Sequence, residues 1–345
     1  MCVGTSCAAR VPVPSLLLEP GITQQGLRFE RTVVSSDSQS AGRVMELHRD
    51  DTSHAVLVLR AHGAEWLDGS SVERRLAFGP SLFRATLLHL RGGGLGVAGL
   101  SGRRDVPVLS LTDARTVATL RGGVYVRPLA GNILGDAASE VLLPDRAGIR
   151  VYSPDGEFLR TIRSPWYASD RTFVQADDDP ELEITFVGTH LAGGPIDVHV
   201  VNADGSVVSA WHSERGNWIS WIPALNAGAL WGLASDGFVE WDSRGHELAV
   251  YPAEGVDYLR DVSGAESGGY VALVASGNGY RGRSVLNIYD RAKHLVYQEV
   301  FAGRTYSIIA DPDASVGFLV GTNADVLRLR LAVPASLGIH KRSGH

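Results

Sequence analysis

Short apolar segments alternate with turns rich in glycine, proline, asparagine and aspartate along most of this chain. In the clearest stretch, apolar strands at 140–143 and 149–152 are followed by a turn at Asp155-Gly156 and an alternating strand at 157–162. Apolar runs of this length bounded by turn residues are typical of strands, and an Asp-Gly pair supplies the positive φ of a tight hairpin. The pattern therefore predicts antiparallel strands joined by short turns.

The same unit recurs along the chain. Its last turn falls at residues 68, 113, 155, 204, 244 and 292, so successive copies are 40 to 49 residues apart. One more apolar segment precedes each copy and would form the inner strand of a four-stranded blade. These segments are 44–47, 86–90, 125–129, 173–176, 218–222, 258–262 and 306–310. Repeats of this length are typical of propeller blades, so we predict an all-β, seven-bladed β-propeller.

The last blade lacks its outer strand at the C-terminus. Segments 317–321 and 326–331 fit its second and third strands, whereas residues 25–33 match the turn and outer strand of the copy at 155–162. Pairing this N-terminal strand with the last blade closes the ring and leaves no open edge. We therefore predict a flexible tail at 1–24, one propeller at 25–333 and a C-terminal tail at 334–345.

Charge and hydropathy narrow the classes of partner. The 345-residue chain has a net charge of −6, and Lys293 and Lys341 are its only lysines among otherwise scattered arginines. Nucleic-acid surfaces gather basic residues on one face, so we expect no nucleic-acid partner. The apolar runs are far shorter than a membrane-spanning helix, so no transmembrane segment is predicted. We expect a soluble monomer; the compartment stays open, and export would require a signal removed ahead of residue 1.

Aromatic residues recur at the start of five consecutive predicted inner strands. Recurrence at one structural position indicates packing, so we expect these rings to wedge between neighbouring blades. They are Tyr125, Phe173, Trp218, Tyr258 and Tyr306.

Long loops at one mouth of the central channel carry the candidate ligand-binding residues. The longest predicted loops are 163–172, 188–195 and 275–283. They place aromatic rings beside guanidinium groups, a combination that suits sugars, carboxylates or a peptide segment. The candidates are Trp166, Tyr167, Asp170, Arg171, His190, Asn278, Tyr280, Arg281, Arg283 and Arg304.

Two classes of function remain open. The first is a non-catalytic binding or scaffold propeller that presents these loops to a carbohydrate or protein partner. The second is a lyase or hydrolase with its active site over the channel, for which His190 near Asp170 would be the candidate general base. The sequence identifies no catalytic set, because no paired carboxylates and no nucleophile with its base stand out. We therefore prefer the first class.

Two predicted hairpins between first and second strands carry acidic residues ahead of an apolar strand. They are 131–136 before 140–143, with Asp136, and 177–183 before 184–187. This plan resembles the FG-GAP-like (integrin-α-N-terminal-like) propellers, which commonly bind Ca²⁺ in such hairpins. The resemblance implies Asp177, Asp179, Glu181 and Glu183 as candidate ligands, since calcium takes several oxygens from one loop. The alternative, which we prefer, is a solvated acidic hairpin in a protein without a cofactor.

Overall fold

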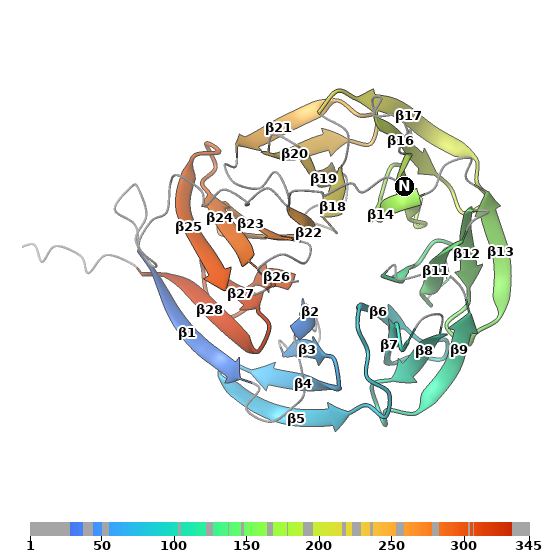
Figure 1. The fold of residues 1–345 in the computed structure, drawn as a ribbon, viewed down its shortest axis with the longest axis horizontal. Helices are drawn as coiled ribbons and strands as arrows, with labels where there is room; N and C mark the ends of the chain where they lie inside the picture. The colour runs from blue at the N-terminus through green and yellow to red at the C-terminus, as the bar shows by residue number, and fades with distance from the viewer. Residues whose placement is uncertain are drawn as a thin grey trace, which may run out of the picture.

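Seven antiparallel sheets of four strands each are arranged as a ring in the computed structural model (Figure 1). The structure describes residues 28–36, 44–49, 55–102, 105–121, 127–136, 138–145, 148–163, 168–177, 179–188, 196–215, 219–222, 229–234, 237–252, 259–277, 283–302, 304–305 and 307–332. The predicted seven-bladed β-propeller is confirmed. The part of the chain so described contains no helix that is long and apolar enough to span a membrane.

Each blade runs from an inner strand A to an outer strand D in chain order, except the last. Blade 1 contains β2 (Val44–Arg49), β3 (Val56–Arg60), β4 (Gly63–Asp68) and β5 (Ser71–Ala77). Blade 2 contains β6 (Ala85–His89), β7 (Leu95–Gly99), β8 (Asp105–Ser110) and β9 (Thr116–Arg121). Blade 3 contains β10 (Leu129–Gly131), β11 (Glu140–Asp145), β12 (Gly148–Tyr152) and β13 (Phe158–Arg163).

The second half of the ring follows the same plan. Blade 4 contains β14 (Ala168–Val174), β15 (Glu183–Gly188), β16 (Ile196–Val201) and β17 (Val207–Ser213). Blade 5 contains β18 (Ser220–Ile222), β19 (Ala229–Ala234), β20 (Gly237–Asp242) and β21 (Glu247–Pro252). Blade 6 contains β22 (Leu259–Ser267), β23 (Tyr270–Gly277), β24 (Arg283–Tyr289) and β25 (Leu295–Ala302). Blade 7 contains β26 (Ser307–Ala310), β27 (Gly317–Gly321), β28 (Asp325–Ala332) and, as its outer strand, β1 (Arg28–Ser36).

The hydrophobic core lies between the blades. Among the described residues it divides into seven clusters, each formed by the facing sides of two neighbouring blades. Second strands are covered on both sides, which is why β3 and β27 are buried at every position. Outer strands such as β13 alternate between exposed residues and residues that are partly or fully buried. The short apolar runs in the sequence are therefore strands buried on both faces.

Tight turns between the third and fourth strands occur where the sequence predicts them. The residue at positive φ is Gly69, Ala114, Gly156, Gly205, Gly245 or Lys293 in blades 1 to 6. These turns lie against the preceding blade. For example, a Cβ on Gly156 would lie 2.8 Å from the Ala118 Cβ of blade 2. The turns therefore set both the hairpin geometry and the fit between blades.

The N-terminal strand closes the ring as predicted. β1 pairs antiparallel with β28 from Arg28–Ala332 to Ser36–Asp325, at the left of Figure 1. Phe29 on β1 is 1% exposed and packs against the rings of Tyr270 and Tyr297 in blade 6. Arg31 on the same strand forms an ion pair with Glu299 of β25. One strand thus ties blade 7 to blade 6.

A buried arginine ties β1 to blade 1. The Arg60 side chain is fully buried, and its Nε donates to Glu65 Oε2 at 3.0 Å. Its Nη2 donates to Ser35 Oγ of β1 at 3.0 Å, and its Nη1 donates to the Ala324 carbonyl at 2.8 Å. Ser35 Oγ in turn donates to Glu65 at 2.8 Å. A buried charge is costly unless it is paired and hydrogen-bonded. This network therefore holds β1 of blade 7 against blade 1.

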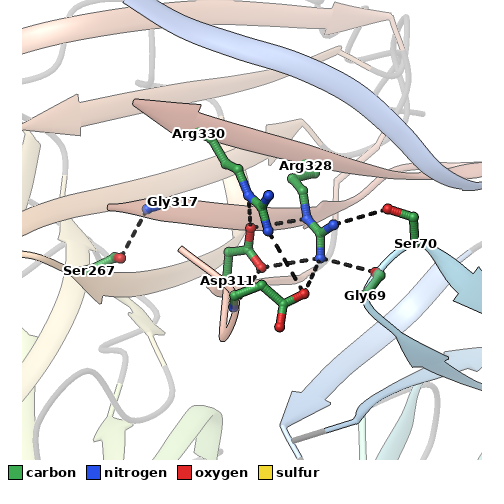
Figure 2. A network of polar contacts seen from close by, with 8 residues as sticks. Gly69, Ser70, Ser267, Asp311, Gly317, Arg328 and Arg330 are labelled. Atoms are coloured by element: carbon green, nitrogen blue, oxygen red, sulfur yellow. Dashed lines mark hydrogen bonds and ion pairs between the residues drawn. The ribbon is translucent and has the colours of Figure 1, made fainter. Parts of the chain in front are cut away.

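A second arginine crosses the same junction at the opposite end of the blades (Figure 2). Arg328 of β28 donates from Nη2 to the Gly69 carbonyl at 3.0 Å and from Nη1 to Ser70 Oγ at 3.2 Å, both in blade 1. It also pairs with Asp311 at 3.0 Å, and Arg330 donates to the same carboxylate at 2.8 Å. Both ends of the junction between blades 7 and 1 are therefore held by guanidinium groups.

Some predicted boundaries were wrong. The predicted loop 163–172 ends early, because β14 begins at Ala168 and therefore includes Asp170 and Arg171. The same strand ends at Val174, two residues before the predicted end, because the Ala176 amide is held by the Glu183 side chain in the hairpin. Arg283 likewise lies at the start of β24. Polar residues near a strand end look like loop residues in a sequence, since only pairing with the next strand places them in the sheet.

One predicted aromatic wedge lies in the described part of the chain. Phe173 on β14 packs so closely against β10 of blade 3 that a Cβ on Gly131 would come within 2.6 Å of its ring. It therefore lies between neighbouring blades, as predicted. Tyr125, Trp218, Tyr258 and Tyr306 lie outside the described residues, so their packing stays a prediction.

We expect Phe29→Ala to lower the free energy of unfolding by about 3–5 kcal/mol, the usual loss for removing a buried phenylalanine side chain. Val33→Ala on the same strand is the matched control, because Val33 is 58% exposed and should change stability by less than about 0.5 kcal/mol. Urea denaturation measures both. Equal, small effects would contradict the role of β1 in closing the ring.

We expect Ala114→Gly to stabilise the protein by up to about 1 kcal/mol. Ala114 has φ 59°, a conformation that costs an L-residue roughly 1–2 kcal/mol, and glycine removes this cost while losing somewhat more chain entropy on folding. Gly156→Ala at the equivalent turn of blade 3, with φ 90°, should destabilise the protein. Thermal denaturation of the pair should show opposite shifts in Tm, and shifts of the same sign would refute this account.

Candidate functional site

The antiparallel order of each blade separates two faces of the ring. A–B hairpins and C–D turns lie at one end of the strands, and B–C and D–A loops lie at the other. The predicted ligand-binding residues belong to the face with the B–C and D–A loops. Of these, Trp166, Tyr167, His190, Asn278, Tyr280 and Arg281 lie outside the described residues, as do the side chains of Asp170 and Arg283.

The structure describes the side chains of the two remaining candidates. Arg171 is 6% exposed, and its Nη2 donates to the Arg127 carbonyl of blade 3 at 2.7 Å. Arg304 is partly buried ahead of β26, and its backbone N–H donates to Asn323 Oδ1 at 3.3 Å. Arg171 lies within the inner strand β14, and Arg304 lies just ahead of the inner strand β26.

The clearest cluster of ligand-type atoms lies on the other face, in the A–B hairpin of blade 4. Asp177, Asp179 and Glu183 each place one carboxylate oxygen within 4.8 Å of the others. Two oxygens on opposite sides of a calcium ion are separated by about 4.8 Å, because Ca–O distances are about 2.4 Å. The spacing therefore fits a single calcium ion between these side chains.

Backbone hydrogen bonds shape this hairpin. Asp177 Oδ1 accepts the Asp179 N–H at 3.0 Å, and Asp179 Oδ1 accepts the Glu181 N–H at 2.8 Å. Glu183, the first residue of β15, is 1% exposed, and its Oε2 accepts the Ala176 N–H at 2.6 Å. Burial, together with repulsion from Asp177 and Asp179, raises the pKa of Glu183. A bound cation would offset both effects.

Gln175 is a possible ligand that the sequence reasoning missed. Its Nε2 donates to the Asp179 carbonyl, so its amide lies on the hairpin. Its Oε1 is buried and has no hydrogen-bond partner among the described residues. A buried carbonyl oxygen without a partner is costly, and a hard cation is one group that would satisfy it. Its position eight residues before Glu183 was the available signal, but an amide does not stand out among acids.

Blade 3 has a related hairpin directly beside that of blade 4. Its first strand-B residue, Glu140, is buried and accepts the Ile133 N–H at 3.0 Å, so it matches Glu183. Desolvation and the charge of Asp136 raise the pKa of Glu140. Asn132, eight residues before Glu140, also has a buried Oδ1 without a partner among the described residues. The hairpin lacks the acid that Asp177 supplies, because Leu134 takes that position.

The two hairpins are in contact. The Leu182 N–H donates to the Asn132 carbonyl at 3.0 Å, and a Cβ on Gly135 would lie 3.2 Å from Glu181 Oε1. Glu181 therefore lies against the hairpin of blade 3, whereas the other three predicted ligands share one cluster.

Blade 7 satisfies the same hairpin positions with arginine. Counted back from the first residue of each second strand, Asp311 and Asp313 match Asp177 and Asp179. Figure 2 shows Asp311 facing both Arg328 and Arg330, and Arg328 Nη2 also donates to Asp313 at 2.9 Å. No ion pair among the described residues neutralises the acids of the blade 4 hairpin. The two blades thus share a backbone plan, but among the described residues only the blade 7 acids are paired with arginine.

The fold and this hairpin together define the class of protein: a seven-bladed β-propeller with an oxygen-rich A–B hairpin. A scan against protein-family models matches none of them, and a search of curated proteins finds no relative.

We expect millimolar Ca²⁺ to raise the Tm of the protein relative to chelator, because a ligand that binds the folded state stabilises it. Asp179→Asn should abolish this shift. Asp313→Asn at the equivalent position of blade 7 is the control; it should lower the baseline Tm by breaking an ion pair but keep the response to calcium.

The response should weaken as the pH falls. Calcium needs ionised carboxylates, and the raised pKa of Glu183 means that protons compete at a higher pH than at an ordinary glutamate. Calcium titrations from pH 7.5 to pH 5 measure this loss. A Tm that does not differ between calcium and chelator at pH 7.5 would refute the site.

Proposed function

We propose that this chain is a non-catalytic binding or scaffold propeller, braced by calcium on one face, that presents the loops of its other face to a carbohydrate or protein partner. The observation that carries the calcium part of this proposal is the donor set of the blade 4 hairpin, formed by three carboxylates and a buried amide oxygen. Its spacing also supports the resemblance to FG-GAP-like propellers.

The position of the hairpin favours a structural role for the metal. β15 spans six residues from Glu183 to Gly188, so at roughly 3.3 Å per residue its two ends lie about 17 Å apart. An ion held at Glu183 is therefore too far from the B–C loop that follows Gly188 to contact a ligand there. It would neutralise the acids and hold β14 and β15 together.

The closed junctions on both sides of blade 7 support a role for the ring as a rigid frame that holds the loops. Arg60 and Arg328 fix both ends of the junction between blades 7 and 1, and Phe29 fixes the junction with blade 6. A rigid ring with long loops on one face is a common arrangement for recognition, because the loops vary while the frame holds their ends. Aromatic and arginine residues in those loops suit sugar rings or peptide segments.

We expect the purified protein to bind members of a glycan or peptide array, and the double variant Trp166→Ala, Tyr167→Ala to lose this binding. Phe158→Ala is the matched control, because Phe158 is 54% exposed on the outer strand β13, away from the loops. Release of cleaved product from a bound glycan would instead favour a lyase or hydrolase. Binding that Phe158→Ala reduces as much as the loop variant would contradict recognition by the loops.

A further inference from the structure

Two histidines and one carboxylate lie together on the side of blade 4 that faces blade 3. Asp197 on β16 is directly opposite His212 on β17, and His199, two residues after Asp197, is opposite Phe186 on β15. Opposite residues of an antiparallel pair, and residues two apart on one strand, point to the same side of the sheet. Phe186 belongs to the core cluster that includes Ile149 of blade 3, so all four side chains face that blade.

His199 is the buried histidine of this group. Its ring stacks on Phe186, with 5.4 Å between the ring centroids and 15° between the ring planes. Phe186 is 3% exposed, and His199 is partly buried above it. A neutral imidazole contributes to this packing, whereas a protonated one would bring a charge to the edge of the core shared by blades 3 and 4.

His212 is the exposed histidine and pairs with the acid. Its Nδ1 forms an ion pair with Asp197 Oδ1, and the His212 side chain is 73% exposed while that of Asp197 is 13% exposed. Burial lowers the pKa of His199; the carboxylate of Asp197 opposes this shift, and the charge of His212 adds to it. A charge on His199 would therefore share its nearby carboxylate with a second histidine.

The neighbouring strands bring two further charged groups to this side, and both are arginines. Arg171 on β14 is opposite Phe186 and donates to the Arg127 carbonyl of blade 3 at 2.7 Å. Arg160 on β13 of blade 3 donates to the Ala203 carbonyl of blade 4 at 3.4 Å. Arginine keeps its charge at all ordinary pH values, whereas histidine changes its charge between pH 8 and pH 5.

We propose that the junction between blades 3 and 4 is an acid-sensitive element of the ring, held by neutral His199 and loosened when this imidazole becomes protonated. A histidine with a lower pKa in the folded protein than in the unfolded chain stabilises the fold while it is neutral. This contribution is lost as the pH falls below about 6.5, the pKa of an unperturbed histidine. The inference goes beyond the proposed function, since it concerns the action of acid on the ring itself and needs no ligand.

The test is urea denaturation of the full chain between pH 7.5 and pH 5.0, in chelator so that calcium does not contribute. We expect the urea midpoint of the wild-type protein to fall further over this range than that of His199→Gln, because glutamine stays neutral throughout. The comparison uses the change with pH, so a constant loss of stability from the missing ring stack does not affect it.

His246→Gln is the matched control. His246 also pairs with an aspartate, Asp242, but it is 75% exposed in the C–D turn of blade 5. The control should keep the acid-induced loss of the wild-type protein. A wild-type midpoint that falls no further with pH than that of His199→Gln would overturn the proposal.

Nuclear magnetic resonance of ¹³C-labelled histidine measures the titration of the same ring directly. The His199 signal, assigned by its absence in His199→Gln, should titrate below about pH 6.5. In His212→Gln it should titrate at a higher pH than in the wild-type protein, because the competing charge is gone. Titration of wild-type His199 above pH 6.5 would refute the proposal, because Asp197 and the face of Phe186 would then favour the charged ring.

Discussion

The pairing of β1 with β28 is the contact on which the rest of the ring depends. It joins the N-terminal strand to a strand about three hundred residues later and completes blade 7, whose two neighbours then bury their facing sides against it. Without this strand, blade 7 would expose an edge, and the cores shared with blades 6 and 1 would lose Phe29 and Val34. Every junction stabilises the ring of blades, and the pairing of β1 with β28 joins the two ends of the described chain.

Two buried arginines lie at the junction between blades 7 and 1. Arg60 is fully buried and Arg328 nearly so, and each pairs with a carboxylate of its own blade and donates to a backbone carbonyl of the neighbouring blade. Buried ion pairs add less stability than apolar packing of the same volume, because desolvation offsets their attraction. Both arginines nevertheless join the two blades directly, through hydrogen bonds to the carbonyls of Ala324 and Gly69.

The A–B hairpins of blades 4 and 7 share one backbone plan but differ in the partners of their acids. Blade 7 places Arg328 and Arg330 against Asp311, whereas blade 4 gathers three acids with a buried amide oxygen. On the opposite face, the Arg127 side chain of blade 3 forms hydrogen bonds with both blade 1 and blade 2. Both signs of charge occur on the hairpin face, because Arg328 and Arg330 lie beside the acids of blade 7.

Periodic features of the chain predicted the fold well. The repeat of 40 to 49 residues, the Asp-Gly turns and the unpaired last blade led to seven blades and to closure by the N-terminal strand, because hydrophobic alternation and turn chemistry are local properties. The acidic cluster of blade 4 was also found from spacing, since its members belong to one hairpin.

By contrast, only tertiary packing showed that Asp170 and Arg171 belong to β14 and that Gln175 shares the acidic hairpin through its amide. It also showed that Arg60 and Arg328 form hydrogen bonds across the junction between blades 7 and 1. The roles of these two arginines depend on partners up to hundreds of residues away, because a side chain's burial and bonding are set by the blade that comes to lie beside it.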